Sequence, residues 1–276
     1  MTYTFPPRPV IHATHSGAGA PVILLHGSAA HAAQWRSMVG CLEGRFKVIT
    51  PDLPGYGKSA HRCFATMSLE DIARALSPIV DREAEPVHLV GHSFGGAVAL
   101  KFASLFPGKV ASLTLIEPAA FNAVQDILDR TDFVKAGRNS MTAAQEGEPW
   151  EAMRFFMDFW NGTGTWGRMS HELRQKMCTQ VSNIHRDFNA LLGDHFDSED
   201  AVNVRCPSLV ITGDASPVEM QRIRDRLMAL LPVARAKVIE GAGHLVPMTD
   251  PHIVDPMVGE FIAQAASGWQ DYEMAA

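Results

Sequence analysis

Residues 87–96 read Val-His-Leu-Val-Gly-His-Ser-Phe-Gly-Gly, and this stretch decides the fold. The apolar run Val87–Val90 predicts a short buried strand, and residues Gly95–Phe106 follow a helical pattern. Between the two lies Ser93, in a Gly-x-Ser-x-Gly turn whose small neighbours leave room for a strained backbone. The stretch therefore predicts a strand, a sharp turn and a helix, with a serine hydroxyl presented at the turn.

A serine at the start of a helix is a candidate nucleophile. Backbone N–H groups and the positive end of the helix dipole would stabilise an oxyanion that forms beside Ser93. The hydroxyl itself is a poor nucleophile until a base removes its proton. His244 follows the last predicted strand and a Gly-Ala-Gly turn, where a loop can bring its imidazole over the serine. We therefore expect Ser93 and His244 to act as nucleophile and base.

Short apolar runs alternate with helical patterns along most of the chain. This alternation predicts an α/β fold with a doubly wound, mostly parallel sheet, whose ligand binds at the carboxyl ends of the strands. The expected strands are Val22–Leu25, Phe46–Ile49, Val87–Val90, Leu113–Ile116, Leu209–Thr212 and Lys237–Ile239. The expected helices are Leu69–Val80, Gly95–Phe106, Val218–Leu231 and Ile253–Ala266.

Between residues 119 and 204 the sequence shows no strand-like apolar runs. Met, Phe and Trp occur there in helical stretches such as Trp150–Trp160. This segment is interpreted as an inserted helical cap, and residues 1–118 together with 205–276 as the core domain. Most of the aromatic side chains are expected to fill the interior of the cap. Only a few are expected to face a binding pocket.

The sequence resembles the α/β-hydrolase superfamily in four motifs, spread over nearly the whole chain outside the cap and the C-terminal tail. They are His26-Gly27, Asp52-Leu53-Pro54-Gly55-Tyr56-Gly57-Lys58-Ser59, the turn at Ser93, and Gly241-Ala242-Gly243-His244. The resemblance implies the α/β-hydrolase fold with Ser93 at its nucleophile elbow. It also implies that the backbone N–H groups of Ser28 and Phe94 form the oxyanion hole, and it assigns no chemistry to residues 52–59.

The acid of the catalytic triad is where the chain departs from the family pattern. Relatives carry Asp three residues after the glycine that ends the strand, whereas Gly213-Asp214-Ala215-Ser216 has a serine there. A serine cannot compensate the charge of an imidazolium, so another carboxylate must serve. Glu117 is favoured, because it ends the expected strand Leu113–Ile116, where some family members carry their acid instead. Asp214 stays open as the alternative. In an extended chain it would lie roughly 7 Å behind residue 216, the position of the usual acid.

The resemblance implies a serine hydrolase that works by two-step acyl transfer, in which Ser93 attacks a carbonyl carbon and water then releases the acyl group. Carboxylic esters or lactones are the expected substrates, and the cap rich in Met and aromatic residues favours a small or medium apolar acyl group. Carbon–carbon bond hydrolases of ring-fission products and perhydrolases use the same triad and stay open. A non-catalytic ligand receptor on this fold is a further alternative, which the intact Ser93 and His244 disfavour.

Composition and motifs argue against several other classes. The chain of 276 residues has a net charge of −6 and no run of Lys and Arg, so nucleic acid is not an expected partner. Residues 1–10 lack the pattern of a secretion signal, and no apolar run reaches the ~18 to 20 residues that span a bilayer. We therefore expect a cytoplasmic enzyme without membrane contact. No metal or cofactor is expected, the partner is a small-molecule substrate, and a homodimer is left open.

Overall fold

The computed structural model describes residues 11–61, 66–124 and 132–268. The first ten residues, to which the expectation about a secretion signal applies, lie outside this part. Within it, seven strands form one sheet in the order β1-β3-β2-β4-β5-β6-β7. β1 runs antiparallel to β3, and the other neighbouring pairs are parallel. The strands are β1 Ala13–Ser16, β2 Pro21–Leu25, β3 Lys47–Pro51, β4 Val87–His92, β5 Val110–Ile116, β6 Ser208–Gly213 and β7 Ala234–Ile239.

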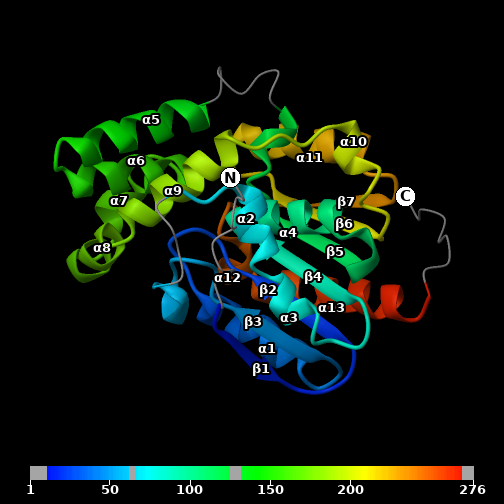
Figure 1. Ribbon diagram of the computed structural model, residues 1–276. Helices are drawn as coiled ribbons and strands as arrows, with labels where there is room; N and C mark the ends of the chain where they lie inside the picture. Colours follow the sequence, from blue (N-terminus) through cyan, green and yellow to red (C-terminus); the bar gives the residue numbers. More distant parts are fainter. Residues whose placement is uncertain (1–10, 62–65, 125–131, 269–276) are drawn as a thin grey trace, which may run out of the picture.

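Helices cover both faces of the sheet (Figure 1). α1 packs on α13, and α2 packs on α4, which itself contacts β4 and β5. The α-helices are α1 Arg36–Leu42, α2 Leu69–Arg74, α3 Ser77–Val80, α4 Phe94–Leu105, α5 Asp132–Gln145, α6 Pro149–Asn161, α7 Thr165–Arg168, α8 His171–Cys178, α9 Val181–Leu192, α10 Ser198–Ala201, α11 Val218–Leu230, α12 Val246–Thr249 and α13 Pro251–Ala266.

The central strands are apolar on both faces because helices lie on both sides of them. In β2, Val22 and Leu24 belong to the hydrophobic cluster that includes α1 and α13. Ile23 and Leu25 point the other way, into the cluster that includes α2 and α4. All four side chains are fully buried. Successive residues of a strand alternate between faces, so a continuous apolar run is what such a doubly covered strand requires.

The expected α/β fold with a mostly parallel sheet is confirmed, and two local predictions need correction. The expected helix Leu69–Val80 is wrong, because the structure has two helices, α2 and α3, in that range. Pro78 lies in the first turn of α3 and cannot donate the backbone hydrogen bond that a continuous helix needs. β1 was not expected, since Ala-Thr-His-Ser is not an apolar run. It is an edge strand that is held by its backbone pairing with β3.

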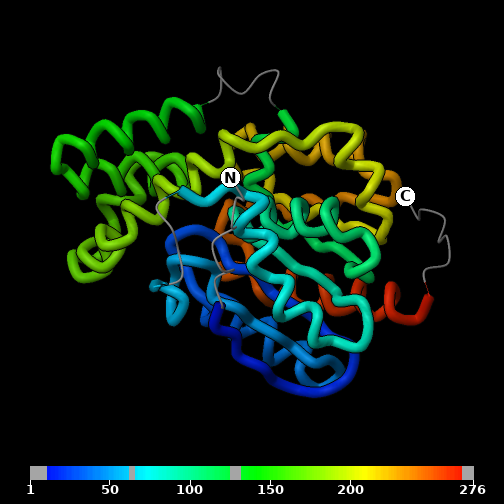
Figure 2. The backbone as a smooth tube through the Cα atoms, viewed as in Figure 1, coloured from blue at the N-terminus to red at the C-terminus, as the bar shows by residue number. Residues whose placement is uncertain are grey.

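Helices without strands occupy the described residues between β5 and β6. We name α5 to α9 the inserted helices, and Figures 1 and 2 show them gathered on one side of the molecule. The aromatic stretch Trp150–Trp160 lies within α6. Where a cap domain would begin and end, at residues 119 and 204, stays a prediction.

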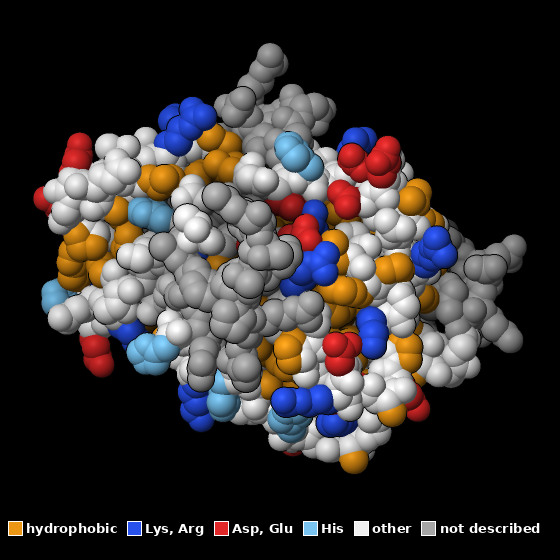
Figure 3. Space-filling model, in the orientation of Figure 1, with side chains coloured by type: hydrophobic (Ala, Val, Ile, Leu, Met, Phe, Trp, Pro, Cys, Tyr) orange, Lys and Arg blue, Asp and Glu red, His pale blue; other side chains and the backbone are white. Residues whose placement is uncertain are grey.

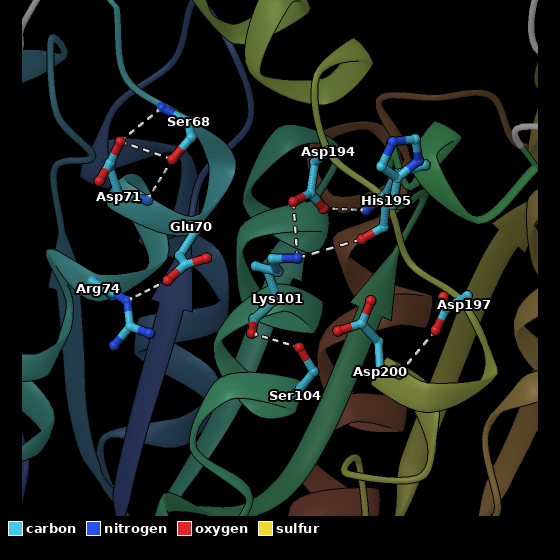
Figure 4. Close-up of polar contacts among 11 residues, drawn as sticks. Ser68, Glu70, Asp71, Arg74, Lys101, Ser104, Asp194, His195, Asp197 and Asp200 are labelled. Carbon is cyan, nitrogen blue, oxygen red and sulfur yellow. Dashed lines mark hydrogen bonds and ion pairs between the residues drawn. The ribbon is translucent and has the colours of Figure 1, made fainter.

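A buried ion pair ties the chain just after the inserted helices to the core. Lys101, on α4, places its Nζ 2.8 Å from Asp194 Oδ1 and donates to the His195 carbonyl oxygen at 3.3 Å (Figure 4). Asn122 donates its side-chain amide to the other oxygen of Asp194 at 2.7 Å. Because several donors surround the carboxylate, its burial is compensated and the segment after α9 is held against α4.

The surface in view carries charges of both signs. Figure 3 shows Lys and Arg side chains interspersed with Asp and Glu, rather than gathered in one patch. Across the three described ranges, no helix combines the length and the apolar character needed to cross a membrane.

Two glycines allow the close crossing of β4 and α4 at Ser93. A Cβ atom on Gly95 would lie 2.3 Å from the carbonyl oxygen of Leu25, on β2. A Cβ atom on Gly91 would lie 2.3 Å from the carbonyl oxygen of Gly95. These oxygens belong to the backbone of the central sheet and of α4, so moving them would distort hydrogen-bonded backbone and lower the stability of the fold.

We therefore expect Gly95→Ala to lower the free energy of unfolding by about 2 to 4 kcal/mol. The matched control is Gly108→Ala, because a Cβ atom at Gly108 meets no atom within 4 Å. The control should change stability by less than about 0.5 kcal/mol. Urea unfolding monitored by circular dichroism measures both, and equal stabilities for the two variants would contradict the crossing as the reason for Gly95.

Candidate active site

Ser93 sits in a strained turn between β4 and α4. Its φ is +53°, in a region that costs a non-glycine residue about 1 to 3 kcal/mol. Backbone hydrogen bonds to the next strand and its following loop hold it there. The Ser93 N–H donates to the carbonyl oxygen of Ile116 at 3.0 Å, and the Ser93 carbonyl oxygen accepts from the N–H of Ala119 at 3.0 Å. The turn is thus anchored to the carboxyl end of β5 and to the loop that follows it.

The side chains of Ser93 and His244 meet, although 151 positions separate them. His244 Nε2 lies 2.9 Å from Ser93 Oγ, and His244 Nδ1 lies 3.0 Å from Glu117 Oε2. With Nδ1 protonated and donating to the carboxylate, Nε2 is free to accept the serine proton. His244 is 4% exposed and Glu117 is fully buried, so water competes little for these bonds. The three side chains form one continuous chain of hydrogen bonds.

Glu117 bridges the ends of two neighbouring strands. It directly follows β5, and its N–H donates to the Ile211 carbonyl oxygen at 2.8 Å. One carboxylate oxygen faces His244, and the other accepts the N–H of Gly213, at the end of β6, at 2.6 Å. A buried carboxylate needs both oxygens satisfied, and here each has a donor.

The alternative acid, Asp214, lies elsewhere. Its side chain is exposed, and Oδ1 accepts the N–H of Gly241 at 2.7 Å. Among the described residues no hydrogen bond joins Asp214 to His244, so the structure brings Glu117 rather than Asp214 to the imidazole. Ser216, at the position where relatives carry their acid, is buried with its hydroxyl unpaired within the same residues.

Ser28 and Phe94, expected to provide the oxyanion hole, line the same cavity as Ser93. Phe94 is the first residue of α4, so its N–H has no acceptor in a preceding turn and lies at the positive end of the helix. Ser28 follows β2 and donates its hydroxyl to Asp187 Oδ2 on α9 at 2.7 Å. The two expected donors therefore come from the turns after two neighbouring strands.

His92 links the loop of His244 to the loop of Ser28. Its Nε2 donates to the carbonyl oxygen of His244 at 2.8 Å, and its Nδ1 accepts from the Gln34 amide at 3.1 Å. Gln34 Oε1 in turn accepts the N–H of Gly27 at 3.2 Å. Burial lowers the pKa of His92 to about 3, so this imidazole is neutral and can both donate and accept. His92 shapes the loops, and its ring nitrogens are both occupied.

His26 follows β2, the strand next to β4, and it also connects two loops through its ring nitrogens. Its Nδ1 donates to the Gly27 carbonyl oxygen at 2.8 Å, and its Nε2 accepts the N–H of Leu53 at 2.9 Å. Burial lowers the pKa of His26 to about 4. It thereby joins the loop after β2 to the motif at residues 52–59.

Trp160, on α6, covers the imidazole of His244. The two rings are stacked with centroids 3.8 Å apart and planes 21° apart. Sequence reasoning placed Trp160 in an aromatic helix but did not bring it to the site. No residue pattern marks one aromatic of α6 as the one that faces His244, because that depends on how the helix docks on the core.

A small cavity of about 40 Å³ lies beside Ser93, beneath the inserted helices. This volume holds roughly one or two water molecules. Polar side chains also line it, among them Ser140 and His185, whose Oγ and Nε2 lie 3.2 Å apart. Its aromatic lining consists of Phe94, Phe133, Phe156, Phe159, Trp160 and Phe188.

His26 and His92 are among the buried histidines whose lowered pKa values make stability depend on pH. The pKa values of His26 and His92 lie below 6.5 in the folded protein, so only the unfolded chain takes up their protons as the pH falls below about 6.5. Their contribution is complete above that pH and is lost on acidification. Between pH 7.5 and 4.5 we expect each to lower the free energy of unfolding by roughly 2 to 3 kcal/mol.

Urea unfolding of the wild type and of His92→Gln at both pH values measures this effect. An amide does not titrate in this range, so the variant should lose less stability between pH 7.5 and 4.5. An identical pH dependence in the two proteins would show that His92 is not buried in its neutral form.

Similarity to known proteins identifies the family of the chain. A model of the alpha/beta hydrolase family matches residues 22–255. The chain is 46% identical over 101 residues to a pimeloyl-[acyl-carrier protein] methyl ester esterase of Methylococcus capsulatus. It is 39% identical over 104 residues to a 2-hydroxy-6-oxo-2,4-heptadienoate hydrolase of Pseudomonas putida. These matches cover 37% and 36% of this chain and only 38% of each relative's length.

A solved structure is similar over a longer range. A thermophilic esterase from Thermogutta terrifontis with bound malate superposes with a TM-score of 0.72. The similarity covers 92% of this chain and 93% of that one, at 23% identity, and supports the fold. Because the family model spans most of the sequence, the chain belongs to the alpha/beta hydrolase family.

Proposed function

We propose that this enzyme is a serine hydrolase that cleaves carboxylic esters through an acyl-enzyme at Ser93. The observation that carries the proposal is the continuous chain of hydrogen bonds from Ser93 Oγ through His244 to Glu117. A serine becomes a nucleophile when a base accepts its proton and a carboxylate compensates the charge of that base. The three side chains have the contacts that these roles require.

The reaction runs in two halves. Ser93 Oγ attacks the carbonyl carbon while its proton passes to His244 Nε2, and the carbonyl electrons move to the oxygen. When the tetrahedral intermediate collapses, the carbon–oxygen bond to the alcohol breaks and Nε2 protonates the leaving oxygen. A water molecule then attacks the acyl carbon, gives its proton to Nε2, and the acid leaves as Ser93 regains the proton.

The surroundings supply the electrostatic support. Glu117 faces the imidazolium that exists while His244 holds the proton, and both groups are shielded from water by burial and by Trp160. Their attraction is therefore stronger than it would be at the surface. The N–H groups of Ser28 and Phe94 are proposed to bind the oxyanion, as the resemblance implies.

The lining of the cavity favours an apolar acyl group. Six aromatic side chains surround the space beside Ser93, so burial of an aliphatic or aromatic acyl chain would be favourable. The esterase among the relatives acts, by its name, on a methyl ester, which agrees with ester chemistry. The cytoplasmic location, the small-molecule partner and the open question of a homodimer stay predictions.

Carbon–carbon bond hydrolysis is the second candidate. The relative named 2-hydroxy-6-oxo-2,4-heptadienoate hydrolase shares 39% identity over its matched segment, and the Ser–His–acid arrangement serves that reaction too. The kcat/KM values for a p-nitrophenyl ester and for a ring-fission diketone, measured side by side, decide between the two reactions.

Ser93→Ala tests the nucleophile. The variant should lose hydrolysis of p-nitrophenyl butyrate by about 10⁴-fold or more, and it should no longer be labelled by a fluorophosphonate. Intact-mass spectrometry measures the label, and circular dichroism confirms the fold. Turnover that survives the substitution would contradict the acyl-enzyme at Ser93, and a wild type that neither hydrolyses esters nor takes the label would favour a ligand receptor.

Glu117→Gln and Asp214→Asn separate the two candidate acids. Glutamine keeps the shape of Glu117 but cannot compensate the imidazolium charge, so kcat should fall by roughly 10⁴-fold. Asp214→Asn is the matched control and should change kcat by less than about threefold. A large loss in the Asp214 variant, with a small one in the Glu117 variant, would reverse the assignment.

A further inference from the structure

Asp187, on α9, reaches from the inserted helices to the loop that carries Ser28. Its Oδ2 accepts hydrogen bonds from Ser28 Oγ at 2.7 Å and from the Tyr56 hydroxyl at 2.5 Å. Its Oδ1 accepts from Arg186 Nη2 at 2.7 Å. The side chain of Asp187 is 2% exposed and lines the same cavity as Ser93. The mechanism above gives this carboxylate no role.

The hydrogen-bond partners of Asp187 offset the energetic cost of burying its charge. Burial raises the pKa of the carboxyl, while the Arg186 guanidinium and the hydroxyl groups of Tyr56 and Ser28 oppose that rise. A buried ion pair with its lone pairs satisfied is costly to break but holds its geometry closely. The guanidinium also offsets a negative charge that would otherwise oppose the oxyanion.

The loop after β2 needs such external support. Ala29 has a φ of +59°, a conformation that costs a residue with a Cβ atom roughly 1 to 2 kcal/mol. On one side of it, the Gly27 N–H is held by Gln34 at 3.2 Å. On the other side of the turn, Ser28 Oγ donates to Asp187 Oδ2 at 2.7 Å. Without that contact, the strained loop would lose one of its anchors to the rest of the protein.

We propose that Asp187 is a positioning residue, which holds the Ser28 N–H toward the reacting carbonyl oxygen only while α9 is docked on the core. The inference rests on the serine mechanism proposed above, because it concerns the oxyanion of that mechanism. It makes the oxyanion hole a joint product of the core and the inserted helices.

Two variants break this link by different means. Ser28→Ala removes the hydroxyl and keeps the backbone N–H, and Asp187→Asn removes the charge and keeps the shape. If Asp187 acts through Ser28, kcat should fall by roughly 10- to 100-fold in both variants, with KM changed by less than about threefold. The affinity for an aryl boronic acid, which forms a tetrahedral adduct on Ser93, should fall by the same factor as kcat/KM.

Asn183→Ala is the matched control. Asn183 lies on the same helix, donates to the Gly55 carbonyl oxygen at 2.9 Å and accepts from Arg186 Nη1 at 3.1 Å. It therefore also ties α9 to the core and contacts the partner of Asp187, but among the described residues its side chain hydrogen-bonds to neither Ser28 nor Asp187. Its kcat and boronic acid affinity should stay within about threefold of the wild type. Thermal unfolding of all variants separates losses of stability from losses of oxyanion binding.

The inference is overturned if Ser28→Ala loses no more kcat or boronic acid affinity than Asn183→Ala, or if the loss lies in KM alone. Ser28→Ala decides the matter even where Asp187→Asn fails to fold, because it removes a single hydroxyl group. Failure of the serine mechanism itself has a different signature, since Ser93→Ala would then keep the activity of the wild type.

Discussion

The hydrogen bond between Glu117 and His244 is the interaction on which the site depends. Both groups are buried, so neither can exchange its partner for water, and the second oxygen of Glu117 is held by the Gly213 N–H. One carboxylate thus joins the ends of β5 and β6 to the loop after β7. With the imidazole held in this way, its Nε2 faces Ser93 Oγ at 2.9 Å, although the two residues are 151 positions apart in the sequence.

Backbone strain is concentrated where this chemistry is proposed. Among the described residues, the non-glycine positions with positive φ are Ala29, Ser93 and Glu117. They lie in the loop after β2, in the turn between β4 and α4, and directly after β5. Such conformations persist only where surrounding contacts over-determine them. Here the contacts come from backbone hydrogen bonds between strand ends, from Gln34, and from Asp187 on an inserted helix. Attachment to the sheet stabilises these positive φ values, which would be unfavourable in an isolated loop.

The inserted helices supply aromatic side chains that surround the catalytic site proposed here. Trp160 stacks on the imidazole, and Phe133 packs on Phe188 with ring centroids 5.0 Å apart, so aromatic surface replaces water around the site. Low polarity strengthens the contact between Glu117 and His244. The inserted helices supply most of the aromatic lining of the cavity beside Ser93, so a substrate bound there would contact them directly.

The sequence by itself determined the features that are local. The apolar runs predicted six of the strands, and the Gly-x-Ser-x-Gly turn predicted the elbow, because residues close in the chain dictate strand, turn and helix. It left the acid open between Glu117 and Asp214, and it gave no sign of Trp160 or Asp187 at the site. The contacts of Glu117, Trp160 and Asp187 follow only from the tertiary structure. The register of neighbouring strand ends and the docking of α6 and α9 on the core depend on packing between distant segments.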